Sequence, residues 1–246
     1  MKIIIYATHS FGTFETLQQH PDIVVLGYGK KWQGFIEKAK VIHAYLKTLP
    51  DHEIVAIVDG FDSYILKTDG IEDEFLKMDC KVLVSTHKVQ LTSINIVDNY
   101  LIHKVSSTCK DNIVANSGLM MGYVHELKII WNKIVHGETT DDQVNLNKAC
   151  NVLPFLKLDK QCRIFQNCLN MKEIEESKAY ICQRPGTPSF SRISRAFFEY
   201  TPYFIPEIIG ICIILLIICY FVYDKKIIKQ ITKLKKRSTT ILRKYT

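Results

Sequence analysis

Short apolar runs separated by polar turns occupy the first part of the chain. A run without alternation, such as residues 54–58, is typical of a strand that is buried on both faces in a parallel sheet. Similar runs predict further strands over residues 2–7, 23–26 and 81–85. Between them, residues 35–49 carry apolar positions at helical spacing. This order of elements predicts an α/β fold with a single, mostly parallel sheet flanked by helices.

The pattern is less regular in the following part of the chain. Residues 113–123 have a polar centre between apolar halves, which predicts a strand interrupted by a loop that places Asn116 and Ser117 at a site. A bulged strand with Gly118 at the bulge would explain the same pattern. The further elements expected are a helix over 126–135, a helix that ends at residue 150 and a short strand over 153–158.

Two carboxylates, Asp59 and Asp62, directly follow the predicted strand over residues 54–58. Ligands of open α/β sheets bind at the carboxyl ends of the strands. Two carboxylates three residues apart across a turn can converge on one divalent cation, and oxygen ligands suit Mg²⁺ or Mn²⁺, which commonly accompany nucleotide phosphates. The pair therefore predicts one edge of an active site.

A second acidic pair, Asp141 and Asp142, precedes the helix that ends at residue 150. Thr140 or Asp141 can act as the N-cap of this helix, and taken alone this is the favoured interpretation. A role of the pair at a site is the other possibility.

The formal net charge of +7 is unevenly distributed along the chain. From Asp224 to the end there are nine Lys or Arg residues and one Asp, so this tail carries +8 and leaves −1 for the preceding residues. A neutral main domain argues against a nucleic-acid binder built on a global basic field.

Residues 203–223 form an apolar run, with no charge from Ile208 to Tyr223 and aromatic residues at both ends. About 20 apolar residues span a bilayer core, so this run predicts a transmembrane helix. The basic tail predicts a cytosolic carboxyl end and a lumenal or external main domain. The absence of a signal peptide and of Asn-x-Ser/Thr acceptors favours the opposite, cytosolic placement of that domain.

Eight cysteines occur without any CxxC spacing, which argues against a zinc site. Cys212 and Cys219 lie in the apolar run. Cys162 and Cys168 are close enough in sequence to pair, but buried thiols are the favoured interpretation.

Several sequence blocks occur in a characteristic order. They are Leu26-Gly27-Tyr28-Gly29 with Trp32 and Gly34, Lys40-Val41, Val58-Asp59-Gly60-Phe61-Asp62-Ser63-Tyr64-Ile65-Leu66, Asn116-Ser117-Gly118 with Gly122, Asp141-Asp142-Gln143, and Leu158-Asp159 with Arg163-Ile164-Phe165-Gln166-Asn167. Together they resemble the glycosyltransferase domain of the multifunctional lysyl hydroxylases (procollagen-lysine 2-oxoglutarate dioxygenases). The resemblance covers residues 2–185 and depends on the order and spacing of all blocks.

The resemblance implies a GT-A-like fold with a Rossmann-like sheet, and a transferase that uses a UDP-sugar and Mn²⁺ or Mg²⁺. The positions that match the family's site residues are Asp59 and Asp62 for the metal, Phe61 against the uracil, Thr8, Trp32 and Asn116 at the donor, and Asp141 and Asp142 facing the sugar and the acceptor.

The chain departs from the family pattern in three respects. Its acidic run is shorter, and the resemblance does not extend to the hydroxylase domains. The family's third metal ligand, a histidine, falls at Gln183 in this sequence. A neutral amide is a weaker metal ligand than histidine, so we expect a lower metal affinity.

These observations together predict a membrane-anchored hexosyltransferase that moves galactose or glucose from a UDP-sugar to an acceptor hydroxyl. Hydroxylysine of a collagen-like protein is the acceptor that the resemblance implies. Asp142, with Asp141 as the alternate, is the expected general base. The competing hypothesis is a binding or scaffold protein that kept the fold but lost turnover with its third metal ligand.

The expected domain organisation has four parts. Residues 1–190 form the catalytic domain, 191–202 a linker, 203–223 the transmembrane helix and 224–246 the basic tail. We expect a single-pass protein of the endoplasmic reticulum or a related host membrane, and the family's location favours a lumenal catalytic domain.

Overall fold

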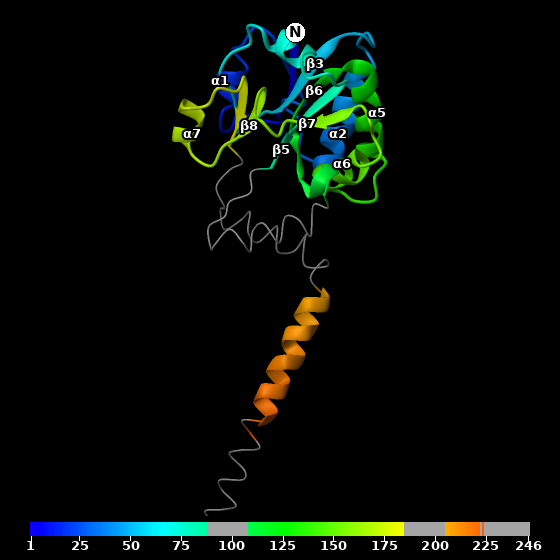
Figure 1. Ribbon diagram of the computed structural model, residues 1–246, viewed down its shortest axis with the longest axis vertical. Coiled ribbons are helices and arrows are strands. Elements are labelled where there is room, and N and C mark those ends of the chain that lie inside the picture. Colours follow the sequence, from blue (N-terminus) through cyan, green and yellow to red (C-terminus); the bar gives the residue numbers. More distant parts are fainter. Residues whose placement is uncertain (88–107, 185–204, 222, 224–246) are drawn as a thin grey trace, which may run out of the picture. The chain divides into compact units, whose positions relative to one another are not determined.

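The computed structural model describes residues 1–87, 108–184, 205–221 and 223 (Figure 1). The chain divides into two units, Met1–Thr187 and Pro188–Thr246. The first unit contains two β-sheets with helices packed around them, and it carries every site residue predicted above.

The larger sheet has six strands in the order β2-β1-β3-β6-β5-β7. Its strands are β1 (Lys2–Tyr6), β2 (Ile23–Leu26), β3 (Ile54–Asp59), β5 (Val82–Thr86), β6 (Ala115–Tyr123) and β7 (Leu156–Leu158). Only β6 runs antiparallel to its neighbours among these strands. The predicted α/β fold with a mostly parallel sheet is therefore confirmed.

A second, smaller sheet was not predicted, so the expectation of a single sheet was wrong. It consists of β4 (Ser63–Ile65), β9 (Ile181–Gln183) and β8 (Phe165–Asn167), in that spatial order. The central strand β9 is antiparallel to β4 and parallel to β8. Strands of three residues are too short to show a periodicity, which explains why the sequence pattern missed them.

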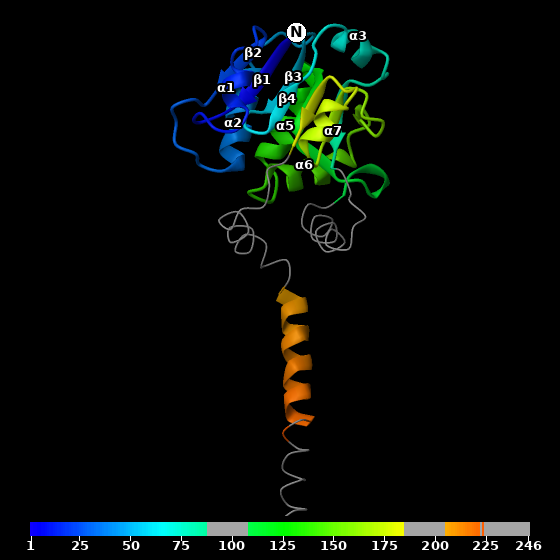
Figure 2. The same cartoon turned by 90° about the vertical axis from the view of Figure 1, so that its left-hand side faces the viewer.

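The helices cover both faces of the larger sheet (Figure 1). They are α1 (Phe14–Leu17), α2 (Phe35–Leu46), α3 (Ile71–Leu76), α5 (Val124–Val135), α6 (Asp142–Cys150) and α7 (Met171–Glu175), with a short 3₁₀ helix η1 (Lys110–Asn112). Helices α2, α5 and α6 share one hydrophobic core with the sheet. Helices α1 and α3 and the smaller sheet enclose the other core, and Figure 2 looks onto that side.

Strand β3 shows why its sequence is apolar at every position. Val55 and Ile57 point into the core under α2 and α5, whereas Ala56 and Val58 point into the opposite core. Because alternate side chains of a strand point to opposite faces, a strand covered on both sides needs an uninterrupted apolar run. Asp59, the last residue of β3, is the first polar residue of the strand and is only partly buried.

Strand β6 is continuous, so the predicted interrupting loop was wrong and the bulged-strand alternative is correct. Its register with β5 shifts abruptly, because Val84 pairs with Met120 but the next residue, Ser85, pairs with Asn116. Residues 117–119 of β6 therefore lie between the two pairs and have no counterpart in β5. This bulge lets β6 continue to the edge of the sheet.

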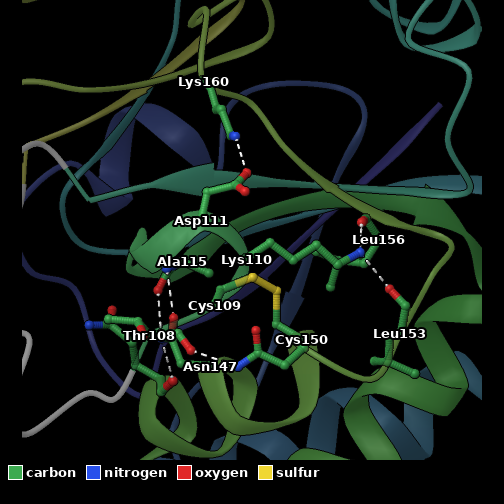
Figure 3. The surroundings of a disulfide bond; sticks show 12 residues. Thr108, Cys109, Lys110, Asp111, Ala115, Asn147, Cys150, Leu153, Leu156 and Lys160 are labelled. Carbon is green, nitrogen blue, oxygen red and sulfur yellow. Dashed lines mark hydrogen bonds and ion pairs between the residues drawn. A yellow bond between two sulfur atoms is a disulfide. The ribbon is translucent and has the colours of Figure 1, made fainter.

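A disulfide joins Cys109 to Cys150 and ties the segment before β6 to the end of α6 (Figure 3). This disulfide was not predicted from the sequence, whereas Cys162 and Cys168 remain thiols. The same segment is held by Lys110, whose Nζ donates to the carbonyl oxygens of Leu153 at 2.8 Å and Leu156 at 2.7 Å. The two cysteines are 41 residues apart, so no local sequence spacing could predict that they pair.

In the second unit, residues 205–221 form a helix. Among the helices that the structure describes, none has the length and apolar character needed to span a bilayer. Residues 203, 204 and 222, the predicted linker over 191–202 and the basic tail over 224–246 lie outside the described residues.

Candidate active site

The predicted site lies at the edge of the larger sheet where β1 and β3 end and β6 begins. Strands β1 and β3 are adjacent and parallel, and Tyr6 pairs with Asp59. Strand β6 is antiparallel to β3, so its first residues, including Asn116, reach the same edge. Thr8 lies two residues after the end of β1. This topology gathers polar residues from three separate segments at the end of the sheet where ligands bind in open α/β folds.

The smaller sheet adds Gln183 to the two carboxylates. Gln183 is the last residue of β9 and pairs with Ser63, which directly follows Asp62. Its Nε2 donates to Oδ2 of Asp59 at 2.9 Å and to Oδ1 of Asp62 at 3.0 Å. The three residues predicted as metal ligands therefore converge on one point, and the nitrogen of the amide faces the carboxylates.

Gly118 on β6 makes this convergence possible. A Cβ atom at position 118 would lie 2.5 Å from Oδ2 of Asp59 and 2.6 Å from Nε2 of Gln183. Both distances are below contact, so a larger residue would displace the carboxylate or the amide. A glycine inside a strand often marks such a close approach of another group.

Lys38 on α2 links Asp59 to Asp142. Its Nζ lies 2.8 Å from Oδ1 of Asp59 and 3.1 Å from Oδ2 of Asp142, and both Lys38 and Asp142 are buried. Burial lowers the pKa of Lys38, but the carboxylates of Asp142 and Asp59 outweigh it and raise that pKa above its usual value. Burial raises the pKa of Asp142, and the charge of Lys38 opposes this rise. The ammonium group thus remains charged at neutral pH and bridges two predicted site residues.

The two neighbouring residues Asp141 and Asp142 have different surroundings. Asp141 is the N-cap of α6, where its Oδ1 accepts hydrogen bonds from the backbone N–H groups of Gln143 at 2.8 Å and Val144 at 3.0 Å. The cap interpretation of Asp141 is confirmed. Asp142 is the first residue of the helix and points toward Lys38, so the fold brings Asp142 to the other acidic residues of the site.

Aromatic rings lie beside the acidic residues, in the loops that follow β1 and β3. The ring of Phe61 lies 5.2 Å from that of His9 and 6.0 Å from that of Phe11, measured between centroids. Thr8 is buried, and its Oγ1 is 3.0 Å from Nδ1 of His9. Trp32 packs edge-on against Tyr6 of β1, with their centroids 5.9 Å apart. The structure therefore places Thr8 and Phe61 in one ring-lined corner and Trp32 against the adjoining strand.

Asn116 is buried behind the carboxylates. Its Nδ2 donates to Oδ1 of Asn167 at 2.8 Å and to Oε1 of Gln183 at 3.0 Å. Asn116 therefore reaches the site through Gln183. Asn167, the last residue of β8, joins the same network.

Lys38, His9 and Asn167 belong to this site but were not predicted. Lys38 carries the one signal that the sequence offers, because it lies four residues before Ile42 on the buried side of α2 and a charged residue there needs a partner. His9 and Asn167 lie in short polar segments without such a signal. Among the described residues there is no group of three or more His, Cys, Asp or Glu side chains that could hold a metal ion.

Comparisons with known proteins match the chain to one family. A family model described as the PLOD GT domain matches residues 6–183. No curated protein matches the chain. A solved structure described as a glycosyltransferase involved in the glycosylation of the major capsid of PBCV-1 is similar at 10% identity and a TM-score of 0.47, and the match covers 79% of this chain and 98% of that one.

Proposed function

Because the chain belongs to the family of lysyl hydroxylase (PLOD) glycosyltransferase domains, we propose that it moves a hexose, galactose or glucose, from a UDP-sugar to an acceptor hydroxyl in a GT-A-like fold. The observation that carries the proposal is a cluster of three carboxylates at the end of the sheet. Lys38 contacts Asp59 and Asp142, and Gln183 links Asp59 to Asp62. Lys38 offsets part of the negative charge of this cluster, and the charge that remains suits a dication.

The donor lies against the loops that follow β1 and β3. Phe61 presents an aromatic ring on which a uracil can stack, with Thr8 in the same corner and Trp32 packed against Tyr6 of β1. In this arrangement the diphosphate points toward Asp59, the last residue of β3, and toward Asp62 in the turn that follows. Asn116 supports the donor site from behind through Gln183.

The carboxylates of Asp59 and Asp62 fit a divalent cation, Mn²⁺ or Mg²⁺. One oxygen of each lies within 3.0 Å of the same nitrogen atom, so a single bound atom can contact both. The cation, when bound, would neutralise the charge that develops on the diphosphate as the glycosidic bond breaks. Gln183 can serve as a third ligand only with its amide turned over, because its Nε2 faces the two carboxylates.

Asp142 is the proposed general base for the acceptor hydroxyl. It is buried next to Lys38, and burial raises its pKa toward the range in which a carboxylate accepts a proton effectively. Asp141 is a weaker choice, because its Oδ1 already caps α6. Hydroxylysine of a collagen-like protein is the proposed acceptor.

We also propose that the protein is attached to a membrane through residues 203–223, with the catalytic domain on the lumenal side of the endoplasmic reticulum or a related host membrane. The Cys109–Cys150 disulfide supports this side, because disulfides form and persist in oxidising compartments. Protease protection on intact membranes tests it, since a lumenal domain resists the protease until detergent is added. Degradation of the domain before detergent would place it on the cytosolic side.

A binding or scaffold protein is the second candidate. The observation in its favour is the contact of Gln183 with both Asp59 and Asp62, which holds the carboxylates together without a cation. The clustering of its carboxylates counts against it, because like charges held together are costly without a function that needs them.

The decisive experiment measures UDP release by the purified full chain. The chain is incubated with Mn²⁺, a hydroxylysine-containing peptide and either UDP-galactose or UDP-glucose. We expect release from at least one donor that depends on the peptide, and none from the Asp59→Asn variant. No release with any donor would favour the binding protein. Calorimetry then separates the steps, since Asp59→Asn should remove the Mn²⁺-dependent part of UDP binding.

A further inference from the structure

Three buried amides form a chain of hydrogen bonds behind the two carboxylates. Asn116, Asn167 and Gln183 are each no more than 5% exposed. Nδ2 of Asn116 donates to Oδ1 of Asn167 and to Oε1 of Gln183, and Nε2 of Gln183 donates to Asp59 and Asp62. This series of hydrogen-bonded amides, called the relay below, therefore runs from Asn167 on β8 through Asn116 on β6 to Gln183 on β9 and ends on the carboxylates.

Two backbone groups determine the orientation of every amide in this relay. The carbonyl oxygen of Thr86 can only accept a hydrogen bond, and it accepts one from Nδ2 of Asn167 at 2.7 Å. The N–H of Gly118 can only donate, and it donates to Oδ1 of Asn116 at 2.7 Å. Turning over either asparagine would bring two donors or two acceptors together.

The orientation of Gln183 follows from these anchors. Its Oε1 is taken up by Asn116, so its NH₂ group faces Asp59 and Asp62. If the amide turned over, its oxygen would oppose two carboxylates and its NH₂ would oppose that of Asn116. A divalent cation requires oxygen atoms around it, which is the opposite arrangement.

We propose that Asn116 and Asn167 are positioning residues that lock Gln183 as a hydrogen-bond donor, so that its amide competes with the divalent cation for Asp59 and Asp62. The relay thereby sets the cation affinity of the site. This inference rests on the proposed function, because it assumes that these two carboxylates bind the cation.

The test measures binding of Mn²⁺ alone to the full chain, from the electron paramagnetic resonance signal of the free ion. Gln183→Met keeps the length of the side chain but removes the donor and the amide oxygen. We expect Mn²⁺ to bind about tenfold more tightly, the factor that corresponds to one hydrogen bond to a charged group. Weaker or unchanged binding would mean that Gln183 is a ligand or a bystander, and would overturn the proposal.

A second substitution tests the relay without altering Gln183. Asn116→Ala removes the donor that engages Oε1, so the amide can turn over and offer its oxygen, and Mn²⁺ should again bind more tightly. The matched control is Asn147→Ala, which removes another buried asparagine that bonds to the backbone of Ala115 at 2.8 Å and 2.9 Å. We expect unchanged Mn²⁺ affinity in this control, and an equal effect of both substitutions would contradict the relay.

Asp59→Asn distinguishes a failure of this inference from a failure of the proposed function. If Mn²⁺ binding depends on Asp59 but Gln183→Met weakens it, only the relay is refuted. If neither the original chain nor any variant shows Asp59-dependent binding, the cation site itself is refuted, and the relay with it.

Discussion

Replacement of Lys38 by methionine tests the electrostatic arrangement of the site. The Nζ atom lies 2.8 Å from Asp59 and 3.1 Å from Asp142, and the side chains of Lys38 and Asp142 are 8% and 5% exposed. Methionine fills a similar volume without a charge. The substitution therefore leaves Asp142 as a buried carboxylate without its cation, next to a second carboxylate.

The expected loss of stability is dominated by Asp142. Removal of one partner from a buried ion pair costs about 3–5 kcal/mol, because the remaining charge is left uncompensated. Asp59 contributes little to this sum, because its side chain is 32% exposed and water screens it. For a domain of this size, we expect the midpoint of thermal unfolding to fall by about 10 °C.

Urea unfolding of the purified chain, followed by the fluorescence of the fully buried Trp131, measures the effect. The raised pKa of Lys38 means that its contribution is complete below the ordinary pKa of lysine and is lost only at higher pH, so pH 7 reports the full effect. The loss should shrink in acid, as Asp142 becomes protonated below its raised pKa.

Lys40→Met is the matched control, because Lys40 lies on the same helix with an exposed side chain and only a 3.9 Å contact with Glu37. Its substitution should change the unfolding free energy by less than about 0.5 kcal/mol. In the double variant Lys38→Met with Asp142→Leu, most of the loss should be recovered, since both charges are gone. Equal effects of the two lysine substitutions, or additive losses in the double variant, would refute the reasoning.

Three further changes test other parts of the site. Asp142→Asn should lower the rate of transfer by about 10²–10⁴-fold, with UDP binding retained. In the original chain we expect the rate to fall in acid as Asp142 is protonated through its raised pKa, and this fall should be absent from the variant. Unchanged turnover would exclude Asp142 as the base. Gly118→Ala should abolish Mn²⁺-dependent UDP binding in calorimetry, because the new Cβ would lie 2.5 Å from Oδ2 of Asp59. The substitution should also lower the free energy of unfolding by about 1–3 kcal/mol. Retained binding would show that the carboxylate can move aside. Replacement of Cys109 and Cys150 by alanine should lower the free energy of unfolding in urea by about 4 kcal/mol, because the disulfide closes a loop over a 41-residue separation. A reductant should destabilise the original chain but not the variant. Equal sensitivity of both proteins to the reductant would contradict a stabilising disulfide.

The strand β3 and the carboxylate at its end could be predicted because both follow from local patterning. Every side chain of residues 55–58 enters one of two cores, so the sequence has no polar position until Asp59. The strands of the smaller sheet contain three residues each and depend on partners far away in the chain. Their pairing, and with it the position of Gln183, left no periodic signal.

The helix α6 shows the same division at the level of single residues. A cap at Asp141 could be predicted because it bonds to residues two and three positions further on. That Asp142 meets Lys38 could not, because this contact joins the start of one helix to another helix more than a hundred residues earlier. Local sequence determines where a helix begins, and packing determines what its first side chain faces.

The sequence by itself determined the alternation of strands and helices, the position of Asp59 and Asp62 at a strand end, and the family of the chain. Only the tertiary structure decided which residues hydrogen-bond to each other at that site, and in which direction. Gln183 lies 124 residues from Asp59, and the nitrogen of its amide faces the carboxylates because backbone groups of β5 and β6 orient the intervening asparagines. Periodicity records which residues are buried, whereas the direction of a hydrogen bond depends on groups that only the folded chain brings together.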